Sequence, residues 1–317
     1  MKNKIGVAIV GTGFGKKIHI PAFQIHPDTE VVAVYHRDLD KARAIAQEFN
    51  IEVASNNLEE ICGLSSVDVV SISTPPFLRY DMAKIALNHG KHLFLEKPLN
   101  LNAYETREIY RLGEEKKLVA VTNFEFRFIP AWQLLAEYLG RDYLGEIRLI
   151  KIDWLVASRA DATRGWNWYS RKEQGGGVLG AIGSHVFDYI HWLFGEIATI
   201  SGYLGCAIPQ RPDIQCNNQL KPVTADDTCL ITLELTNKVP IQVNLSSVTY
   251  QGRGHWLEIY GEKGTLVLGS SNLKDYVHDF KLYISQNNSP LAEVEIPQRL
   301  NFPQIYEDGR LAPVIRV

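Results

Sequence analysis

The sequence predicts an α/β protein of two domains. A doubly wound domain is expected over residues 1–125, and an α/β domain with a mainly antiparallel open sheet over residues 126–317. Three observations lead to this fold class. The chain has 317 residues, more than the roughly 100–200 of a typical single domain. Its first part alternates short apolar runs with helical patterns, and beyond residue 147 it carries longer strand-like runs separated by short turns.

The first domain is predicted from five apolar runs and three segments whose apolar residues are spaced three or four apart. Strands are expected at 5–10, 30–35, 67–73, 92–95 and 118–123, and helices at 40–50, 79–89 and 103–116. Continuous Val and Ile runs are typical of strands buried on both faces, as in a parallel sheet covered by helices. This alternation of strand and helix therefore predicts a doubly wound sheet.

The second domain is predicted from strand-like runs joined by turns short enough for hairpins. Strands are expected at 149–156, 229–235, 241–248, 256–260, 265–268, 280–284 and 292–296, one helix at 178–194, and a loop at 209–223. We find no second long helix, so one sheet face is expected to stay uncovered. The alternating apolar residues are assigned to that face, which predicts a homodimer or homotetramer; they are Ile231, Leu233, Leu235, Ile241, Val243 and Leu245.

The composition of the chain argues against several classes of binding partner. Lys and Arg number 33 against 36 Asp and Glu, so there is no basic excess of the kind that binds nucleic acid. No apolar run approaches the ~20 residues of a membrane span, and the apolar start lacks a signal-peptide cleavage site. Four cysteines show no paired metal spacing, so we expect no metal. A reduced cytoplasmic chain is favoured, with a Cys206–Cys216 disulfide as the alternative.

A glycine-rich turn follows the first predicted strand, with the sequence Gly11-Thr-Gly13-Phe14-Gly15. Glycines at a strand-to-helix turn let the backbone approach a pyrophosphate, and the helix start supplies amide donors. Lys16 stands where the full dinucleotide fingerprint has its third glycine. The turn predicts a dinucleotide site, and the alternative is a tight turn without a ligand.

The residues at the end of the second predicted strand indicate whether NAD or NADP binds. NAD-binding domains commonly place a carboxylate there for the ribose hydroxyls, whereas this chain has His36 and Arg37 followed by Asp38. A basic pair suits a 2′-phosphate, so NADP is favoured over NAD. Asp38 is either a displaced ribose ligand or the cap of the next helix.

Three further groups of residues carry candidate chemistry. Thr74 and Pro75 follow the third strand, and Glu96 and Lys97 follow the fourth, at the rim where ligands bind in open α/β sheets. On spacing alone, Glu96 and Lys97 could equally form a surface ion pair.

The last group begins with the glycine turn 175–177, which leads into an apolar helix with His185 and Asp188 three residues apart. Their spacing places the two side chains on neighbouring faces of that helix. His185 could instead be a core histidine. No third ligand stands at metal spacing, so zinc is not expected.

The order of these motifs resembles that of the Gfo/Idh/MocA oxidoreductases, which include glucose–fructose oxidoreductase and inositol dehydrogenases. The resemblance covers residues 5 to about 310, and its most specific part is Gly90-Lys91-His92-x-x-x-Glu96-Lys97-Pro98. It implies a Rossmann domain that binds the nicotinamide cofactor, followed by an α/β domain whose open sheet often mediates oligomerisation. It also implies that Lys97 positions the reacting oxygen of the substrate and that His185 acts as acid or base.

The chain departs from the family pattern at three places. Ala181 stands where many members have an aspartate four residues before the histidine, and Arg79 replaces a histidine often found after the Thr-Pro pair. The sequence stops at Val317, and we expect it to lack a closing C-terminal segment that often packs on the first domain.

The function expected from these features is hydride transfer between NAD(P) and a sugar, polyol or related hydroxyl or carbonyl compound. Lys97 and His185 are the candidate catalytic residues, and Trp166, Tyr169 and Asp188 are candidates for the substrate pocket. Trp166 could instead be a packing aromatic. Two alternatives remain on the same fold: a nucleotide-dependent sensor without turnover, which Ala181 favours, and a reductase of a ligand such as a tetrapyrrole.

Overall fold

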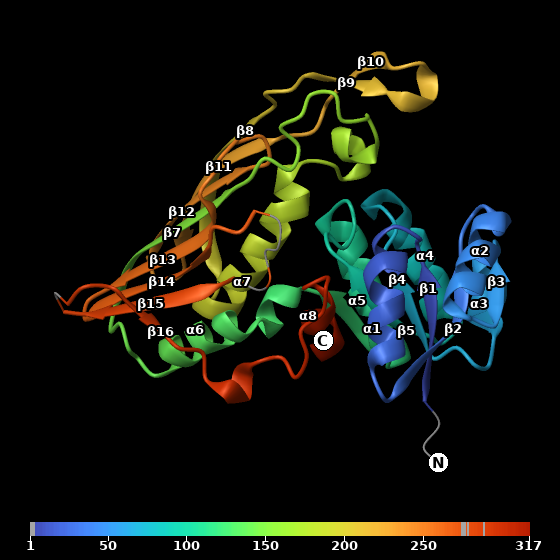
Figure 1. Ribbon diagram of the computed structural model, residues 1–317, viewed down its shortest axis with the longest axis horizontal. Helices are drawn as coiled ribbons and strands as arrows, with labels where there is room; N and C mark the ends of the chain where they lie inside the picture. Colours follow the sequence, from blue (N-terminus) through green and yellow to red (C-terminus); the bar gives the residue numbers. More distant parts are fainter. Residues whose placement is uncertain (1–3, 274–276, 278, 288) are drawn as a thin grey trace. The chain divides into compact units, whose positions relative to one another are not determined.

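The computed structural model describes residues 4–273, 277, 279–287 and 289–317. The chain forms two compact units: unit 1 is Met1–Glu125 with Arg310–Val317, and unit 2 is Phe126–Gly309 (Figure 1). Residues 310–317, which the sequence analysis assigned to the second domain, therefore belong to unit 1. They do so because helix α8 (Leu311–Arg316) packs on helix α1 (Ile20–Ile25), with Val314 buried. A C-terminal segment thus packs on the first domain after all.

Unit 1 is a six-stranded parallel sheet with the strand order β3-β2-β1-β4-β5-β6. Its strands are β1 (Ile5–Val10), β2 (Thr29–Tyr35), β3 (Val53–Ser55), β4 (Val69–Ile72), β5 (His92–Glu96) and β6 (Ala120–Asn123). Its longer helices are α2 (Leu39–Phe49), α3 (Leu58–Gly63), α4 (Pro76–Asn88) and α5 (Ala103–Lys116). This arrangement confirms the predicted doubly wound domain.

Both faces of this sheet are buried, which explains the continuous apolar runs. Ala8 and Val10 pack in a cluster with residues of α3, α4 and α5, whereas Val7 and Ile9 pack in a second cluster with residues of α1 and α2. Strand β3 and helices α1 and α3 are absent from the sequence prediction. Three strand residues are too few to show a period, and α3 begins at a polar cap, the side chain of Asn57.

Unit 2 is built on an eight-stranded sheet with the order β16-β15-β14-β13-β7-β12-β11-β8. Only the β12–β7 pair is parallel, so the predicted mainly antiparallel sheet is confirmed. Its strands are β7 (Ile147–Leu155), β8 (Ile197–Gly205), β11 (Thr228–Leu235), β12 (Pro240–Ser246), β13 (Gly254–Gly261), β14 (Gly264–Ser270), β15 (Lys281–Gln286) and β16 (Ala292–Val294). The expected loop at 209–223 contains a separate hairpin of β9 (Gln210–Asp213) and β10 (Gln219–Pro222).

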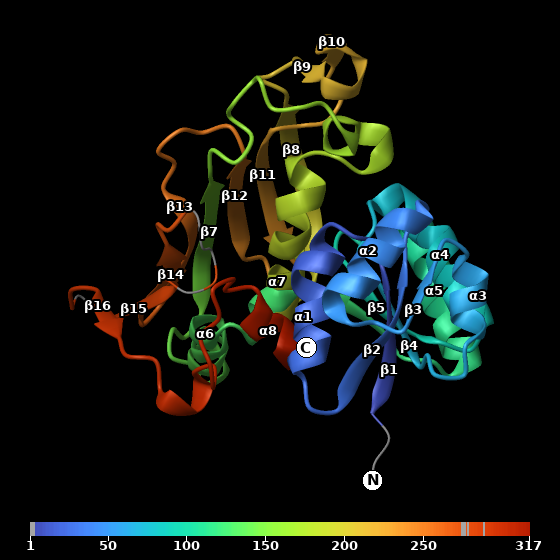
Figure 2. The same cartoon turned by 45° about the vertical axis from the view of Figure 1, so that its right-hand side comes forward.

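The expectation that the alternating apolar residues lie on an uncovered face is wrong. Helix α6 (Pro130–Gly140), which the sequence analysis missed, lies with α7 (Ser184–Phe194) on one face of the sheet (Figure 1). The six alternating residues assigned to the open face are all buried in the core that includes residues of these helices. None of the described helices of unit 2 covers the opposite face of the sheet (Figure 2).

The predicted helix at 178–194 has two parts. Its first turn, η5 (Leu179–Gly183), is a π-helix, and α7 continues from Ser184. Among the described residues, no helix is both long and apolar enough to span a bilayer.

Candidate functional site

The motifs of unit 1 meet at the carboxyl edge of its sheet. Strands β1 and β4 are neighbours, with Val10 paired to Ile72, and the strand order changes direction between them. The turn that follows β1 and the segment that follows β4 therefore leave the sheet side by side. In open α/β sheets this is the position where a ligand binds.

The glycine turn has the shape that a dinucleotide needs. Gly11 has a φ of +106°, and a Cβ atom there would lie 2.7 Å from Oγ of Ser73; a Cβ atom on Gly15 would lie 2.5 Å from the same oxygen. At Gly13 nothing lies within 4 Å of the Cβ position. Two glycines thus let the turn pack on the segment after β4, and the third leaves room for a close approach by a ligand.

The residue that replaces the third fingerprint glycine turns to the surface. Lys16 pairs with Glu48 of α2 at 2.7 Å. Phe14 packs edge-on to the His19 ring at 5.4 Å, with the guanidinium of Arg310 5.2 Å from its centroid. The turn 11–15 therefore fits the pyrophosphate of NAD(P), and Lys16 does not obstruct it.

The structure shows one of the two roles that the sequence left open for Asp38. Its carboxylate accepts hydrogen bonds from the backbone N–H groups of Asp40 and Lys41 at 3.1 and 3.3 Å, so it caps α2. His36 accepts a hydrogen bond from the Asp38 N–H through Nδ1 at 3.0 Å. Arg37 is exposed at the end of β2, whose Tyr35 pairs with Val10 directly before the glycine turn.

Glu96 is directed into the interior of unit 1. Its Oε1 lies 3.1 Å from Nε2 of His19 and accepts a hydrogen bond from Nδ2 of Asn123 at 2.6 Å. Burial would raise the pKa of Glu96, but the hydrogen bond and charge of His19, the charge of Lys97 and the Asn123 hydrogen bond together hold that pKa below its usual range. Glu96, expected as a cofactor ligand, thus anchors the segment that carries Lys97.

Arg79 joins the two ligand-binding segments. It is 3% exposed, and its Nε donates to the carbonyl of Thr74 at 2.8 Å. Its Nη1 donates to the carbonyls of Glu96 and Pro98, on either side of Lys97. Burial lowers the pKa of Arg79 to about 10, so the side chain stays charged at neutral pH. The sequence identified Arg79 only as a departure from the family pattern.

Glu125 is a second buried carboxyl at this edge, and the sequence analysis missed it. The residue is the second after the end of β6 and is 2% exposed. Burial raises the pKa of Glu125 to about 7; the charge of Lys97 opposes this rise and the charge of Glu96 adds to it. Its position two residues beyond the end of a predicted strand was the signal available in the sequence.

In unit 2, His185 lies at the start of α7 and is 3% exposed. Its ring packs edge-on to Phe126 at 4.9 Å and lies 6.0 Å from the Trp154 ring. Ala181 stands four residues earlier in η5, on the same side of the helix, and brings no carboxylate to that position. His185 is thus both buried among aromatic rings and placed at a helix start.

Asp188, expected to contact substrate, forms an ion pair with Arg127 within unit 2. Its two carboxylate oxygens accept hydrogen bonds from Nε and Nη2 of Arg127 at 2.9 and 2.7 Å. The Arg127 guanidinium also lies 5.7 Å from the Trp192 ring centroid. This fork-to-fork pair fixes α7 to the turn η2 (Glu125–Phe128).

Trp166 and Tyr169 lie in the segment between β7 and η5. Trp166 donates from Nε1 to the carbonyl of Pro222 in β10 at 2.9 Å. The ring of Tyr169 lies 3.8 Å from the Arg159 guanidinium, and burial raises the pKa of Tyr169 to about 12. The structure thus associates Trp166 with the β9–β10 hairpin and Tyr169 with Arg159.

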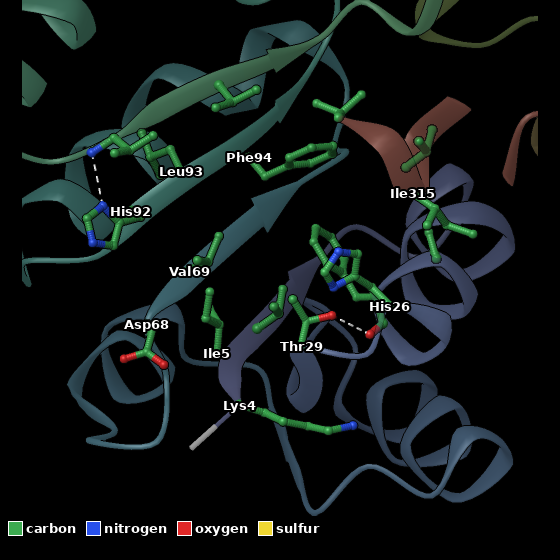
Figure 3. A pocket seen from close by; sticks show the side chains of 17 residues that line it. Lys4, Ile5, His26, Thr29, Asp68, Val69, His92, Leu93, Phe94 and Ile315 are labelled. Atoms are coloured by element: carbon green, nitrogen blue, oxygen red, sulfur yellow. Dashed lines mark hydrogen bonds between the residues drawn. The ribbon is translucent and has the colours of Figure 1, made fainter. Parts of the chain in front are cut away.

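A groove of about 750 Å³ in unit 1 lies away from these motifs (Figure 3). Its lining includes Ile5, Val69 and His92, which begin β1, β4 and β5, so it reaches the amino edge of the sheet. Val314 and Ile315 of α8 also line it. Over the described part of the chain, no cluster of three or more His, Cys, Asp or Glu residues could hold a metal ion.

Comparison with known proteins finds a matching family model for each of the two parts of the chain. Residues 5–124 match the oxidoreductase family with an NAD-binding Rossmann fold, and residues 132–267 match the GFO/IDH/MocA C-terminal domain. An uncharacterized oxidoreductase of Synechocystis sp. is 54% identical over 98% of this chain and 84% of its own length. Levoglucosan dehydrogenase of Pseudarthrobacter phenanthrenivorans is 27% identical over 83% of this chain and 73% of its own.

Solved structures share the fold. Levoglucosan dehydrogenase in complex with NADH and L-sorbose superposes with a TM-score of 0.84 at 24% identity, covering 92% of this chain and 80% of that one. An oxidoreductase domain protein from Kribbella flavida gives a TM-score of 0.86 at 21% identity, covering 99% and 88%.

Proposed function

Because this chain belongs to the Gfo/Idh/MocA family of oxidoreductases, we propose that it transfers a hydride between NAD(P) and a sugar, polyol or related hydroxyl or carbonyl compound. The observation that carries the proposal is the position of Lys97. It follows β5 at the sheet edge that holds the glycine turn, between two carbonyls bound by Arg79. Similarity to levoglucosan dehydrogenase supports a carbohydrate-like substrate.

The bound nicotinamide would supply the hydride chemistry. The turn 11–15 would hold the pyrophosphate, with Thr74 and Pro75 beside it on the segment after β4. Lys97 donates a hydrogen bond to the reacting oxygen and polarises it, and His185 is the candidate acid or base. Glu96 and Arg79 act on Lys97 indirectly, by fixing the backbone on either side of it.

The test is hydride transfer followed by nicotinamide absorbance against a panel of sugars, polyols and their oxidised forms. We expect turnover with at least one compound, and Lys97→Ala should remove most of it. His185→Ala should cost less, on the order of 10²–10⁴-fold, as is usual for general acid–base catalysis. Turnover that survives Lys97→Ala unchanged would show that the catalytic assignment is wrong.

We propose that NADP is preferred over NAD. Asp38 is engaged as a helix cap, which supports Arg37 as the ligand of a 2′-phosphate. Because Arg37 is exposed, its contact is worth about 1.4 kcal/mol, or tenfold in affinity. Titration at fixed ionic strength should show NADPH binding about tenfold tighter than NADH, and Arg37→Ala should abolish the difference. Equal affinities in the wild type would contradict the preference.

A nucleotide-dependent sensor without turnover is the second candidate, because Ala181 removes a carboxylate from the helix that carries His185. It predicts cofactor binding with no hydride transfer on any compound of the panel. Ala181→Asp adds a discriminating measurement. It should raise turnover in an enzyme whose histidine faces position 181, and it should produce none in a sensor.

A further inference from the structure

Two buried carboxyls stand at the sheet edge beside Lys97. Strands β5 and β6 run parallel with Glu96 paired to Asn123, so the residues after both strands leave the sheet next to each other. Neighbouring strands lie about 4.8 Å apart. Lys97 is the residue after Glu96, and Glu125 is the second residue after Asn123.

Glu96, the first of the two carboxyls, is a fixed charge. Glu96 is held by His19 and by Asn123, and His19 is held in turn by Oγ of Ser71 at 2.7 Å. These bonds favour the ionised carboxylate, because they are stronger to a charged oxygen than to a protonated carboxyl. Glu96 is therefore a fixed negative charge and a poor store for a proton.

The surroundings of Glu125, the other carboxyl, raise its pKa. Glu125 is 2% exposed, and the charged groups of unit 1 that act on it are Lys97, Glu96 and Arg310. Burial and the fixed charge of Glu96 disfavour its ionised form, whereas Lys97 and Arg310 favour it, and its pKa is raised to about 7. Near neutral pH such a group exchanges a proton at little free-energy cost in either direction.

We infer that Glu125 is the proton store of this enzyme and that it acts through Lys97. This inference rests on the proposed hydride transfer and names a residue that the family pattern does not supply. Position 181, four residues before His185, holds an alanine and supplies no carboxylate. Glu125 provides a carboxylate on the side of Lys97 instead.

The proton balance of alcohol oxidation is then complete. The substrate C–H bond breaks and its hydride leaves with both electrons to the oxidised nicotinamide. One Nζ proton of Lys97 moves onto the carboxylate of Glu125, and the lone pair that this leaves on Nζ takes the substrate proton as the O–H bond breaks. Lys97 remains an ammonium group, and Glu125 releases its proton to solvent before the next turnover. Carbonyl reduction follows the same steps in reverse.

The first experiment needs no substrate. Infrared difference spectroscopy of the protein should show a carboxyl C=O band that titrates at about pH 7 and is absent from Glu125→Gln. Lys97→Met removes the positive charge that favours ionisation, so the same band should titrate at higher pH. A carboxyl that does not interact with Lys97 would not respond to Lys97→Met. No carboxyl titrating near neutral pH, or no shift in Lys97→Met, would overturn the inference.

The second experiment is the pH dependence of kcat/KM for oxidation. In the wild type it should rise through about pH 7, because the store must be ionised to accept a proton. Glu125→Gln should lose this limb and about 10²-fold in rate above it, and Glu125→Asp should restore part of both. The matched control is Glu108→Gln, a carboxyl of unit 1 that bonds Tyr80 and Tyr104; it should keep the wild-type profile.

The two experiments separate the inference from the function on which it rests. If no compound is oxidised or reduced, the proposed function fails, whereas the infrared titration still decides whether Glu125 and Lys97 share a proton equilibrium. If turnover is found and Glu125→Gln, folded as judged by its thermal unfolding, keeps the wild-type pH profile, the proposed function stands and the proton store is wrong.

Discussion

Arg79 is a buried cation whose hydrogen bonds go to backbone carbonyls of the segments after β4 and β5. Arg79→Ala would leave these carbonyls without a donor, so we expect a loss of about 3 kcal/mol in the free energy of unfolding. Arg79→Lys keeps the charge but cannot reach both segments, so it should be intermediate. Urea unfolding together with cofactor titration checks this, because weaker cofactor binding should accompany the loss. Lys84→Ala on the same helix is the control; if it costs as much as Arg79→Ala, the bridging role is wrong.

The burial of His255 predicts that unit 2 loses stability as the pH falls. It stacks on Trp154 at 3.9 Å, and burial lowers the pKa of His255 to about 3, whereas a histidine in an unfolded chain titrates at about 6.5. Between these values the unfolded chain binds more protons, so stability is complete above the unfolded pKa and falls with falling pH. The loss attributable to His255 should reach about 2 kcal/mol by pH 5.

Thermal or urea unfolding of the wild type and of His255→Phe, as a function of pH, measures this contribution. The variant should be less stable at neutral pH, because it loses the hydrogen bond between Nε2 and the Tyr189 hydroxyl, and it should lose less stability on acidification. Removal of the exposed His89 should leave the wild-type pH dependence. Identical pH dependence in the wild type and His255→Phe would contradict the assignment.

At the scale of elements, substitutions at the cap of α2 can distinguish the two roles that the sequence left open for Asp38, helix cap and ribose ligand. Asp38→Ala removes the acceptor for two backbone N–H groups and should cost about 1 kcal/mol in the free energy of unfolding. Asp38→Asn keeps an acceptor oxygen and should cost much less. NADH titration of both variants completes the test: affinity should stay within a factor of two or so of the wild type. A large loss of NADH affinity in Asp38→Asn would restore the ribose-ligand interpretation.

The elements also show where sequence reasoning succeeds and where it stops. The rhythm of strand and helix identified five of the six strands of unit 1, and the ends of those strands located the glycine turn and Lys97. Strand β8 was missed because it is an edge strand with both faces largely exposed, so it has no alternating apolar pattern. Glu125 and Asn123 gain their meaning only from the pairing of β6 with β5. Such pairing is a long-range property that local patterns do not contain.

At the scale of the whole molecule, the face of the unit 2 sheet opposite α6 and α7 differs from the one expected. Its charges are neutralised within the face: Lys151 pairs with Asp153 at 2.8 Å, and Arg253 pairs with Glu258. Trp256 of β13 stacks on Tyr283 of β15, with ring centroids 6.5 Å apart. The alternating apolar residues of β11 and β12 face the core instead, because α6 and α7 cover them. The sequence could not assign the faces, since a period of two marks a buried face without saying which helix covers it.

This face is where we expect two copies of the chain to associate. Aromatic side chains among neutralised charges are typical of interfaces, where few groups must be desolvated without a partner. We expect a homodimer at micromolar concentration by size-exclusion chromatography with light scattering, and Trp256→Glu should convert it to a monomer, because a twofold axis would place the new charge in the contact twice. Tyr110→Glu, at an aromatic of unit 1 that is 64% exposed, is the control and should remain dimeric. A monomeric wild type would refute the association, and a dimer that survives Trp256→Glu would place the contact on another surface.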